Sequence, residues 1–356
     1  METAVDWSMG AQATRLADWT VAAQIGRRAA GPGVPVAPVA RAKMREDFAE
    51  LVPDSEELIA GFTGLRSDGF RARPWVMSRG DWIDANLRGL QRMLEPLAAR
   101  ILAGRDDRPE FRRKALGLQI GVLLGYVSKK VLGQYDVFLP PDDDGLLYFV
   151  GPNVAEAERR FRLQERDFRL WLALHEVTHR IQFGSASWLR RYLADQIARY
   201  LNTIALDGRE MLRQLSRAVK QIRGGADWKG PNALLLLMTP EQRELFHRMQ
   251  AVMSLLEGHA SFVMNRVADG HVRDLSLMRQ ALKERRRSGG VERVFQRAIG
   301  FESKVRQYDA GERFVAEVVE RAGMNGLNLV WRGAPNLPTP AEIAAPERWL
   351  ERVAPG

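Results

Sequence analysis

The chain has 356 residues, a formal net charge of +9 and no cysteine. Without a thiol it cannot form a disulfide, a thiolate zinc site, an iron–sulfur cluster or a cysteine nucleophile. A transition-metal site must therefore use carboxylates and the histidines, which are His175, His179, His247, His259 and His271. The content of hydrophobic residues (46%) and charged residues (27%) is typical of a globular protein.

The positive charge does not by itself predict a nucleic-acid partner. The 53 basic residues stand against 44 acidic ones, and basic clusters such as residues 285–287 are short and have no interleaved aromatic residues. The most apolar window, residues 115–128, is shorter than the roughly 20 residues that a membrane helix needs. We expect no nucleic acid and no membrane as partners. Because the N-terminus has no basic, apolar export signal, we expect a cytoplasmic protein.

In the first 132 residues the pattern is helical. The periodicity predicts a Pro/Gly-rich linker at residues 31–38 and helices at residues 11–28, 40–51, 55–62, 81–102 and 108–132. Gly117, Gly121 and Gly125 fall on one face of the last helix and predict close approach of a neighbouring helix. Residues 1–80 form an N-terminal helical segment that can belong to the same domain as residues 81–356.

One short region favours strands. Residues 135–139 and 146–150 are rich in β-prone side chains, and residues 140–145 between them are turn formers. This pattern predicts a β-hairpin. Asn153 and Glu156 then have the spacing of a capping box, which predicts a helix that starts at Asn153.

The rest of the chain is again helical in pattern. Thr239-Pro240 and Thr339-Pro340 are strong helix starts, each with a cap residue and a proline at the first helical position. Helices are predicted at residues 167–183, 188–206, 211–222, 240–268 and 291–322, with a short C-terminal one after residue 339. The predicted fold class is mainly α, with one small hairpin.

The sequence contains one strong metal-binding motif. Residues 175–179 read His-Glu-Val-Thr-His, the HExxH pattern, inside the predicted helix at residues 167–183. Residues four apart lie on one helical face, so His175 and His179 can reach the same ion. Glu176 projects roughly 100° away from His175 and can approach a water on that ion without being a ligand. This arrangement is typical of metal-assisted hydrolysis, in which two histidines hold zinc and the glutamate takes a proton from water.

A third protein ligand is expected, because catalytic zinc usually has three and keeps one open position. Glu257 and His259 are the candidates, and about 200° of helix separates them, so both cannot face one ion without a break. Glu257 borders the apolar stripe of its helix, where an unpaired carboxylate is costly to bury. His259 stays an alternative ligand. A glycine at position 258, inside a helix, predicts that another backbone packs closely against it, such as that of the helix that carries HExxH.

Together these residues resemble a gluzincin site, in which a glutamate on a second helix is the third zinc ligand. More closely, the chain is similar to the actinobacterial zincin-like metallopeptidases, formerly described as a domain of unknown function. The resembling residues are 131–136, 150–153, 174–183, 257–262 and 307–308. The resemblance implies a multi-helix zincin-like metallohydrolase domain over residues 81–356, with the hairpin near the active-site helix. It also implies one Zn²⁺ per chain held by His175, His179 and Glu257, with Glu176 as general base.

The pattern also shows departures and weaker candidates. A metzincin would have glycine and histidine where this chain has Gln182 and Ser185, so that subclass is excluded. His259 is either a core histidine or a pocket residue that hydrogen-bonds the substrate or the Glu257 carboxylate. Tyr308 is either a packing residue or the donor that stabilises a developing oxyanion. His247 and His271 have no partner pattern.

Two hypotheses from different classes fit these residues. In the first, the protein is a zinc-dependent, metallopeptidase-like hydrolase that attacks a peptide or small amide carbonyl with activated water. In the alternative, it is a catalytically silent binding or scaffold protein that zinc stabilises. The sequence defines neither the substrate nor the oligomeric state.

Overall fold

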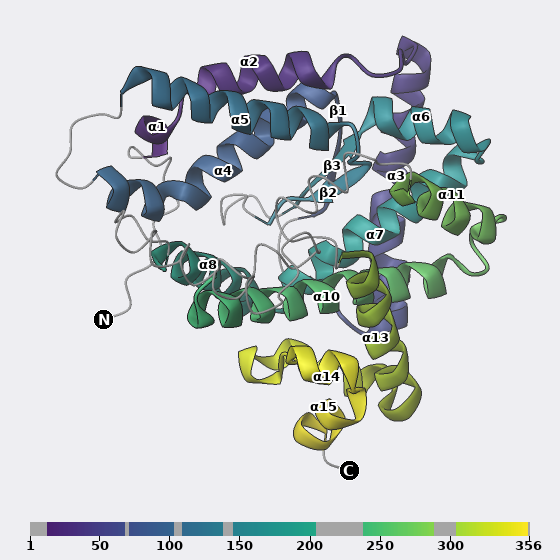
Figure 1. Ribbon diagram of the computed structural model, residues 1–356. Coiled ribbons are helices and arrows are strands. Elements are labelled where there is room, and N and C mark those ends of the chain that lie inside the picture. Colours follow the sequence, from purple (N-terminus) through teal and green to yellow (C-terminus); the bar gives the residue numbers. More distant parts are fainter. Residues whose placement is uncertain are drawn as a thin grey trace. The chain divides into compact units, whose positions relative to one another are not determined.

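The computed structural model describes residues 13–67, 71–102, 109–137, 145–203, 238–287 and 304–354. Within these ranges the protein is mainly helical and has one three-stranded sheet (Figure 1), so the predicted fold class is confirmed. The chain divides into two compact units. The first comprises residues 1–62, 66–185 and 267–273, and the second comprises residues 63–65, 186–266 and 274–356. No helix among the described residues is long and apolar enough to cross a membrane.

The helices of the first unit largely follow the predicted ones. They are α1 (Ala13–Leu16), α2 (Trp19–Ala30), α3 (Pro38–Thr63), α4 (Arg79–Leu102), α5 (Glu110–Ser128), α6 (Gly151–Phe161) and α7 (Glu165–Ser185). The predicted helix at residues 11–28 is interrupted at Asp18, whose carboxylate accepts a hydrogen bond from the Val21 N–H and caps α2. The two helices predicted on either side of Pro53 are one helix, α3, with this proline inside it.

The start predicted for α6 is wrong. The helix begins at Gly151, and the Asn153 side chain caps nothing. It is buried instead, where its amide donates to the Ser128 and Val131 carbonyls and its oxygen accepts from Arg79. A local capping pattern cannot reveal these contacts, because all three partners come from distant parts of the sequence.

The sheet contains β1 (Arg73–Met77), β2 (Gly133–Tyr135) and β3 (Leu146–Val150) in the order β1-β3-β2. Strands β2 and β3 pair antiparallel, which confirms the predicted pairing, although the first strand lies two residues earlier than predicted. Residues 138–144, which include most of the predicted turn, lie outside the described residues. Strand β1, which was not predicted, pairs parallel with β3.

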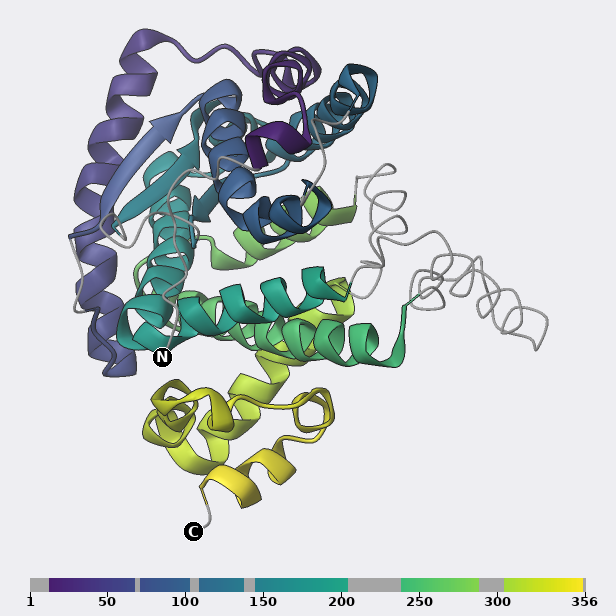
Figure 2. The same ribbon diagram turned by 90° about the vertical axis from the view of Figure 1, so that its left-hand side faces the viewer.

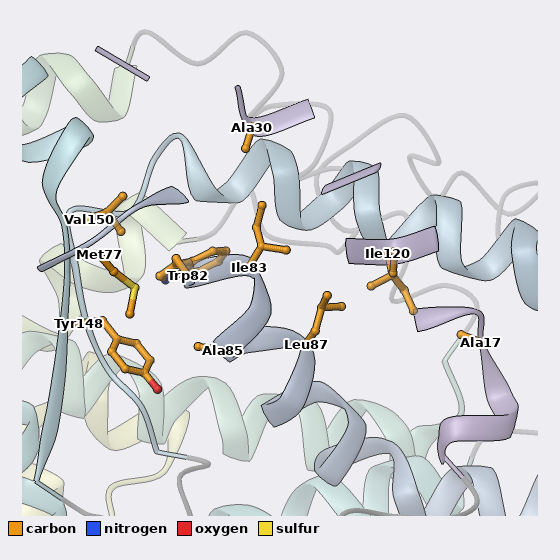
Figure 3. Close-up of a cluster of buried hydrophobic side chains, with 11 residues drawn as sticks. Ala17, Ala30, Met77, Trp82, Ile83, Ala85, Leu87, Ile120, Tyr148 and Val150 are labelled. Carbon is orange, nitrogen blue, oxygen red and sulfur yellow. The ribbon is translucent and has the colours of Figure 1, made fainter. Parts of the chain in front are cut away.

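The two faces of the sheet contact different helices, because alternate residues of a strand point to opposite faces. On one face Tyr148 and Val150 join a buried cluster with Met77 and side chains of α2, α4 and α5, among them Trp82 and Ile83 (Figure 3). On the other face Phe149 stacks on Phe48 of α3. The sheet is thus covered on both sides within the first unit.

Helix α5 packs closely along α2, as its glycines predict (Figure 1). A Cβ at Gly117 would lie 2.3 Å from the Asp18 carbonyl oxygen, and one at Gly121 would lie 2.6 Å from that of Ala22. Side chains at these positions would force the two helices apart, so the prediction of close helix approach is confirmed.

The second unit is helical throughout its described residues. It contains α8 (Ser187–Asn202), most of α10 (Pro240–Ala268), α11 (Leu275–Arg287), α13 (Lys304–Leu327), the 3₁₀ turns η3 (Asn328–Arg332) and η4 (Ala334–Asn336), α14 (Pro340–Ala344) and α15 (Pro346–Val353). Thr239 and Thr339 cap α10 and α14 in capping boxes, as predicted. Near the C-terminus of the chain, helices α14 and α15 pack on α13 (Figure 2). The helix predicted at residues 211–222 lies outside the described residues.

Candidate metal centre

Helix α7 carries the HExxH motif and runs from Glu165 to Ser185, which confirms the predicted helix. Most of its side chains between Phe168 and Phe183 are buried. His175 and His179 are half-buried, and their rings lie 4.8 Å apart between centroids at an angle of 87°. The helical spacing therefore brings both imidazoles to one face, as a shared metal ion requires.

The orientation of His179 is set by its neighbour Gln182. The Nδ1 atom of His179 lies 2.9 Å from the Gln182 side-chain oxygen. Since an amide oxygen only accepts, Nδ1 is the protonated nitrogen, and the lone pair is on Nε2. Metal-ligating histidines commonly have their second ring nitrogen held in this way. With its lone pair on Nε2, His179 is in a tautomer that can bind zinc, so this residue fits a zinc site.

The sheet holds one oxygen of the Glu176 carboxylate. It is 5% exposed, and its Oε2 accepts a hydrogen bond of 2.9 Å from the Tyr135 N–H. Strand β2 is an edge strand, so one row of its backbone groups is left unpaired by the sheet. The Tyr135 ring also packs on Phe183 of α7, with centroids 5.7 Å apart. The hairpin thus lies beside the motif helix, as the family resemblance implied.

A buried ionic cluster fixes the N-terminal part of α7. Arg169 is 2% exposed and contacts Asp47 of α3 at 2.6 Å, Glu158 of α6 at 2.8 Å and Glu165 at 2.7 Å. Burial would raise the pKa of Asp47, but hydrogen bonds from Lys43 and Arg169 lower it below its usual value. Burial raises the pKa of Glu158, against the opposing effect of Arg169. This cluster joins three helices and was not predicted.

The two candidates for a third ligand lie on α10, in the second unit. Glu257 is half-buried, whereas His259 is fully buried and packs edge-on against the Trp331 ring at 5.2 Å. Gly258 does face another backbone, but it is that of α13: a Cβ there would lie 2.2 Å from the Gly311 carbonyl carbon. The prediction of close approach is confirmed, and the proposed partner helix is corrected.

The other candidate residues from the sequence are Tyr308, His247 and His271. Tyr308 lies in α13, and its side chain is outside the described residues. His247 and His271 hydrogen-bond within α10 and its C-terminal end, to Gln250 and the Val267 carbonyl. Among the described residues, the group of His, Cys, Asp or Glu side chains that could hold a metal ion consists of His175, His179 and Glu257. His259 is not part of that group.

A helical protein with this motif and these candidate ligands has the features of a zincin, and comparison with known proteins agrees. The model of the zincin-like metallopeptidase family matches residues 17–350, so the chain belongs to that family. The chain is also similar to the crystal structure of a proposed hydrolase with a novel fold from Chloroflexus aurantiacus. The two are 32% identical, with a TM-score of 0.70, over 96% of this chain and 100% of that one. No curated protein matches the chain.

Proposed function

We propose that this protein is a zinc-dependent hydrolase of peptide or other amide bonds. Its single Zn²⁺ would be bound by His175, His179 and Glu257, and Glu176 would act as the general base. Membership in the zincin-like metallopeptidases supports zinc and hydrolysis as a class. The ligand set, the base and the substrate are our proposal.

The observation that carries the ligand set is a spacing. One candidate ligand atom from each of His175, His179 and Glu257 falls within 4.8 Å of the others. Ligands about 2.0–2.2 Å from one zinc ion must lie within such a distance of one another. Two imidazoles and one carboxylate also match the ligand set of known zinc peptidases.

Each residue would have a distinct role in hydrolysis. Bound zinc would supply Lewis-acid activation of the attacking water and of the scissile carbonyl. Glu176 would take the proton from that water and pass it to the leaving amine. Gln182 would keep His179 in the required tautomer. The Tyr135 N–H, bound to one oxygen of Glu176, would hold the carboxylate in place for this proton transfer.

Metal analysis of the purified protein tests the ligand set. We expect about one zinc per chain in the wild type, a loss of zinc in Glu257→Ala, and retained zinc in His259→Ala, its matched neighbour on α10. Undiminished zinc in Glu257→Ala would overturn the ligand assignment.

An activity assay tests the base. With a library of internally quenched peptides, we expect Glu176→Gln to keep its zinc and to lose hydrolysis by about 10²–10⁴-fold. A wild-type rate in this variant would show that Glu176 is not the base. A zinc-loaded wild type that cleaves no amide in the library would favour the scaffold role instead.

A further inference from the structure

Strand β2 constrains the Glu176 side chain at a second point besides the Tyr135 N–H. A Cβ placed on Gly133 would lie 2.7 Å from Glu176 Oε1, 2.8 Å from its Cγ and 3.0 Å from its Cδ. Real Cβ atoms essentially never come so close to another heavy atom. The Glu176 side chain therefore lies in the space that any residue other than glycine would fill.

The backbone of Gly133 gives no other reason for glycine. It has no positive φ, unlike Gly31, Gly33 or Gly64, so its conformation is open to other residues. The three heavy atoms nearest to a Cβ at this position all belong to the Glu176 side chain. Removing this side chain would relieve those three contacts.

The strand itself is fixed on its other side and cannot easily give way. Gln134 points away from Gly133 and Tyr135, since strand residues alternate. Its side-chain oxygen accepts from the Trp82 indole at 2.7 Å, and its amide donates to Asn86 at 3.2 Å, both on α4. On the sheet side, Gly133 is paired with Phe149 of β3. An added methyl group would therefore displace Glu176 rather than the strand.

We propose that Gly133 is a positioning residue for Glu176. It lets the carboxylate pack directly against β2, while the Tyr135 N–H fixes one of its oxygens. The inference rests on the proposed function, in which Glu176 is the base, and it adds that strand β2 sets where the base stands. A displacement of about 1 Å at a reacting group can cost about 10²-fold in rate.

The kinetic test uses Gly133→Ala, with Gly61→Ala as the matched control. Gly61 lies in α3, and a Cβ there would meet nothing within 4 Å. We expect Gly133→Ala to lower kcat about 100-fold while KM and zinc content stay at the wild-type values. Gly61→Ala should leave all three unchanged. A wild-type kcat in Gly133→Ala would overturn the positioning role.

A second test does not depend on activity. The midpoint of urea unfolding is measured for Gly133→Ala in the wild type and in Glu176→Ala. We expect the substitution to lower the midpoint only where the Glu176 side chain is present, because residues in contact are not additive. Gly61→Ala should act equally in both backgrounds. An equal fall for Gly133→Ala in both would show that Glu176 is not what the methyl group meets.

The two tests separate the inference from the proposed function. If the urea midpoints are coupled but Glu176→Gln hydrolyses at the wild-type rate, the proposed base is wrong and the contact is right. If Glu176→Gln is inactive but the midpoints are not coupled, the base stands and the role of Gly133 falls.

Discussion

Helix α7 contains two buried polar regions that are held in opposite ways. At its N-terminal end, Arg169 is surrounded by the carboxylates of Asp47, Glu158 and Glu165, so charge is matched by charge. Roughly two to three turns later, Glu176 and His179 each have a neutral hydrogen-bond partner within the first unit. Glu176 accepts from a backbone N–H, and His179 donates to an amide oxygen.

This difference fits a structural role for the ionic cluster and the functional role that we propose for the motif residues. The ionic cluster uses the hydrogen-bonding capacity of its members on one another and links α7 to α3 and α6. The neutral partners of the motif fix one atom of each group: Oε2 of Glu176 and Nδ1 of His179. In the proposed mechanism, the other oxygen of Glu176 would serve proton transfer and Nε2 of His179 would bind the metal ion.

The largest expected effect is on stability, at the ionic cluster. Arg169→Ala would remove the arginine that pairs with the buried Glu158 carboxylate and makes the shortest ion pair of Asp47, which costs about 3–5 kcal/mol in the free energy of unfolding. The control is Arg166→Ala: Arg166 also contacts Asp47, at 3.2 Å, but it is half exposed and its loss should cost about 1 kcal/mol or less. Urea unfolding measures both. Equal costs would mean that burial does not distinguish the two arginines.

The next effect is on metal affinity, at Gln182. Gln182→Ala removes the acceptor that holds His179 in the tautomer that the proposed zinc site needs, and losses of such partners typically cost 10–100-fold in affinity. Competition with a chromophoric chelator measures the zinc dissociation constant. Gln182→Glu is the control, since its carboxylate can accept from the same Nδ1–H. If Gln182→Ala binds zinc as tightly as the wild type, the neutral partner has no functional role.

The same contrast explains what the sequence could reveal. The helix that carries HExxH, the two threonine caps and the glycine row of α5 have local signals, and each was confirmed at its predicted place. Partners in the ionic cluster are up to 122 residues apart along the chain, so no local pattern pairs them.

The features that the sequence did not predict also depend on contacts between distant parts of the chain. Strand β1 is short, contains Arg73 and Pro74, and pairs with a strand about 73 residues later, so its own residues carry little strand signal. The contact of Glu176 with strand β2 could not be predicted either, because every residue except proline has a backbone N–H and the sequence does not show which one donates. In Asn153 a real local pattern was overridden by tertiary hydrogen bonds.

The smallest effect is on the pH dependence of stability. A carboxyl whose folded pKa is lowered, such as that of Asp47, stabilises the protein above its unfolded pKa near 3.8, and the contribution is lost as the pH falls through the folded pKa. For Glu158 the sign reverses. Its folded pKa is raised above 4.5, so its charged form is a cost that disappears as the pH falls through the folded value toward 4.5.

The two groups are therefore expected to act in different pH windows. Relative to the wild type, Asp47→Asn should flatten the loss of stability below about pH 4, whereas Glu158→Gln should remove a gain that develops as the pH falls toward 4.5. Urea midpoints at intervals from pH 3 to pH 8 measure both differences. Arg169 lowers the pKa of both carboxyls, so in an Arg169→Ala background the Asp47→Asn difference should shrink, whereas the Glu158→Gln difference should grow. If neither difference changes in that background, Arg169 does not set the pH response of these two carboxyls.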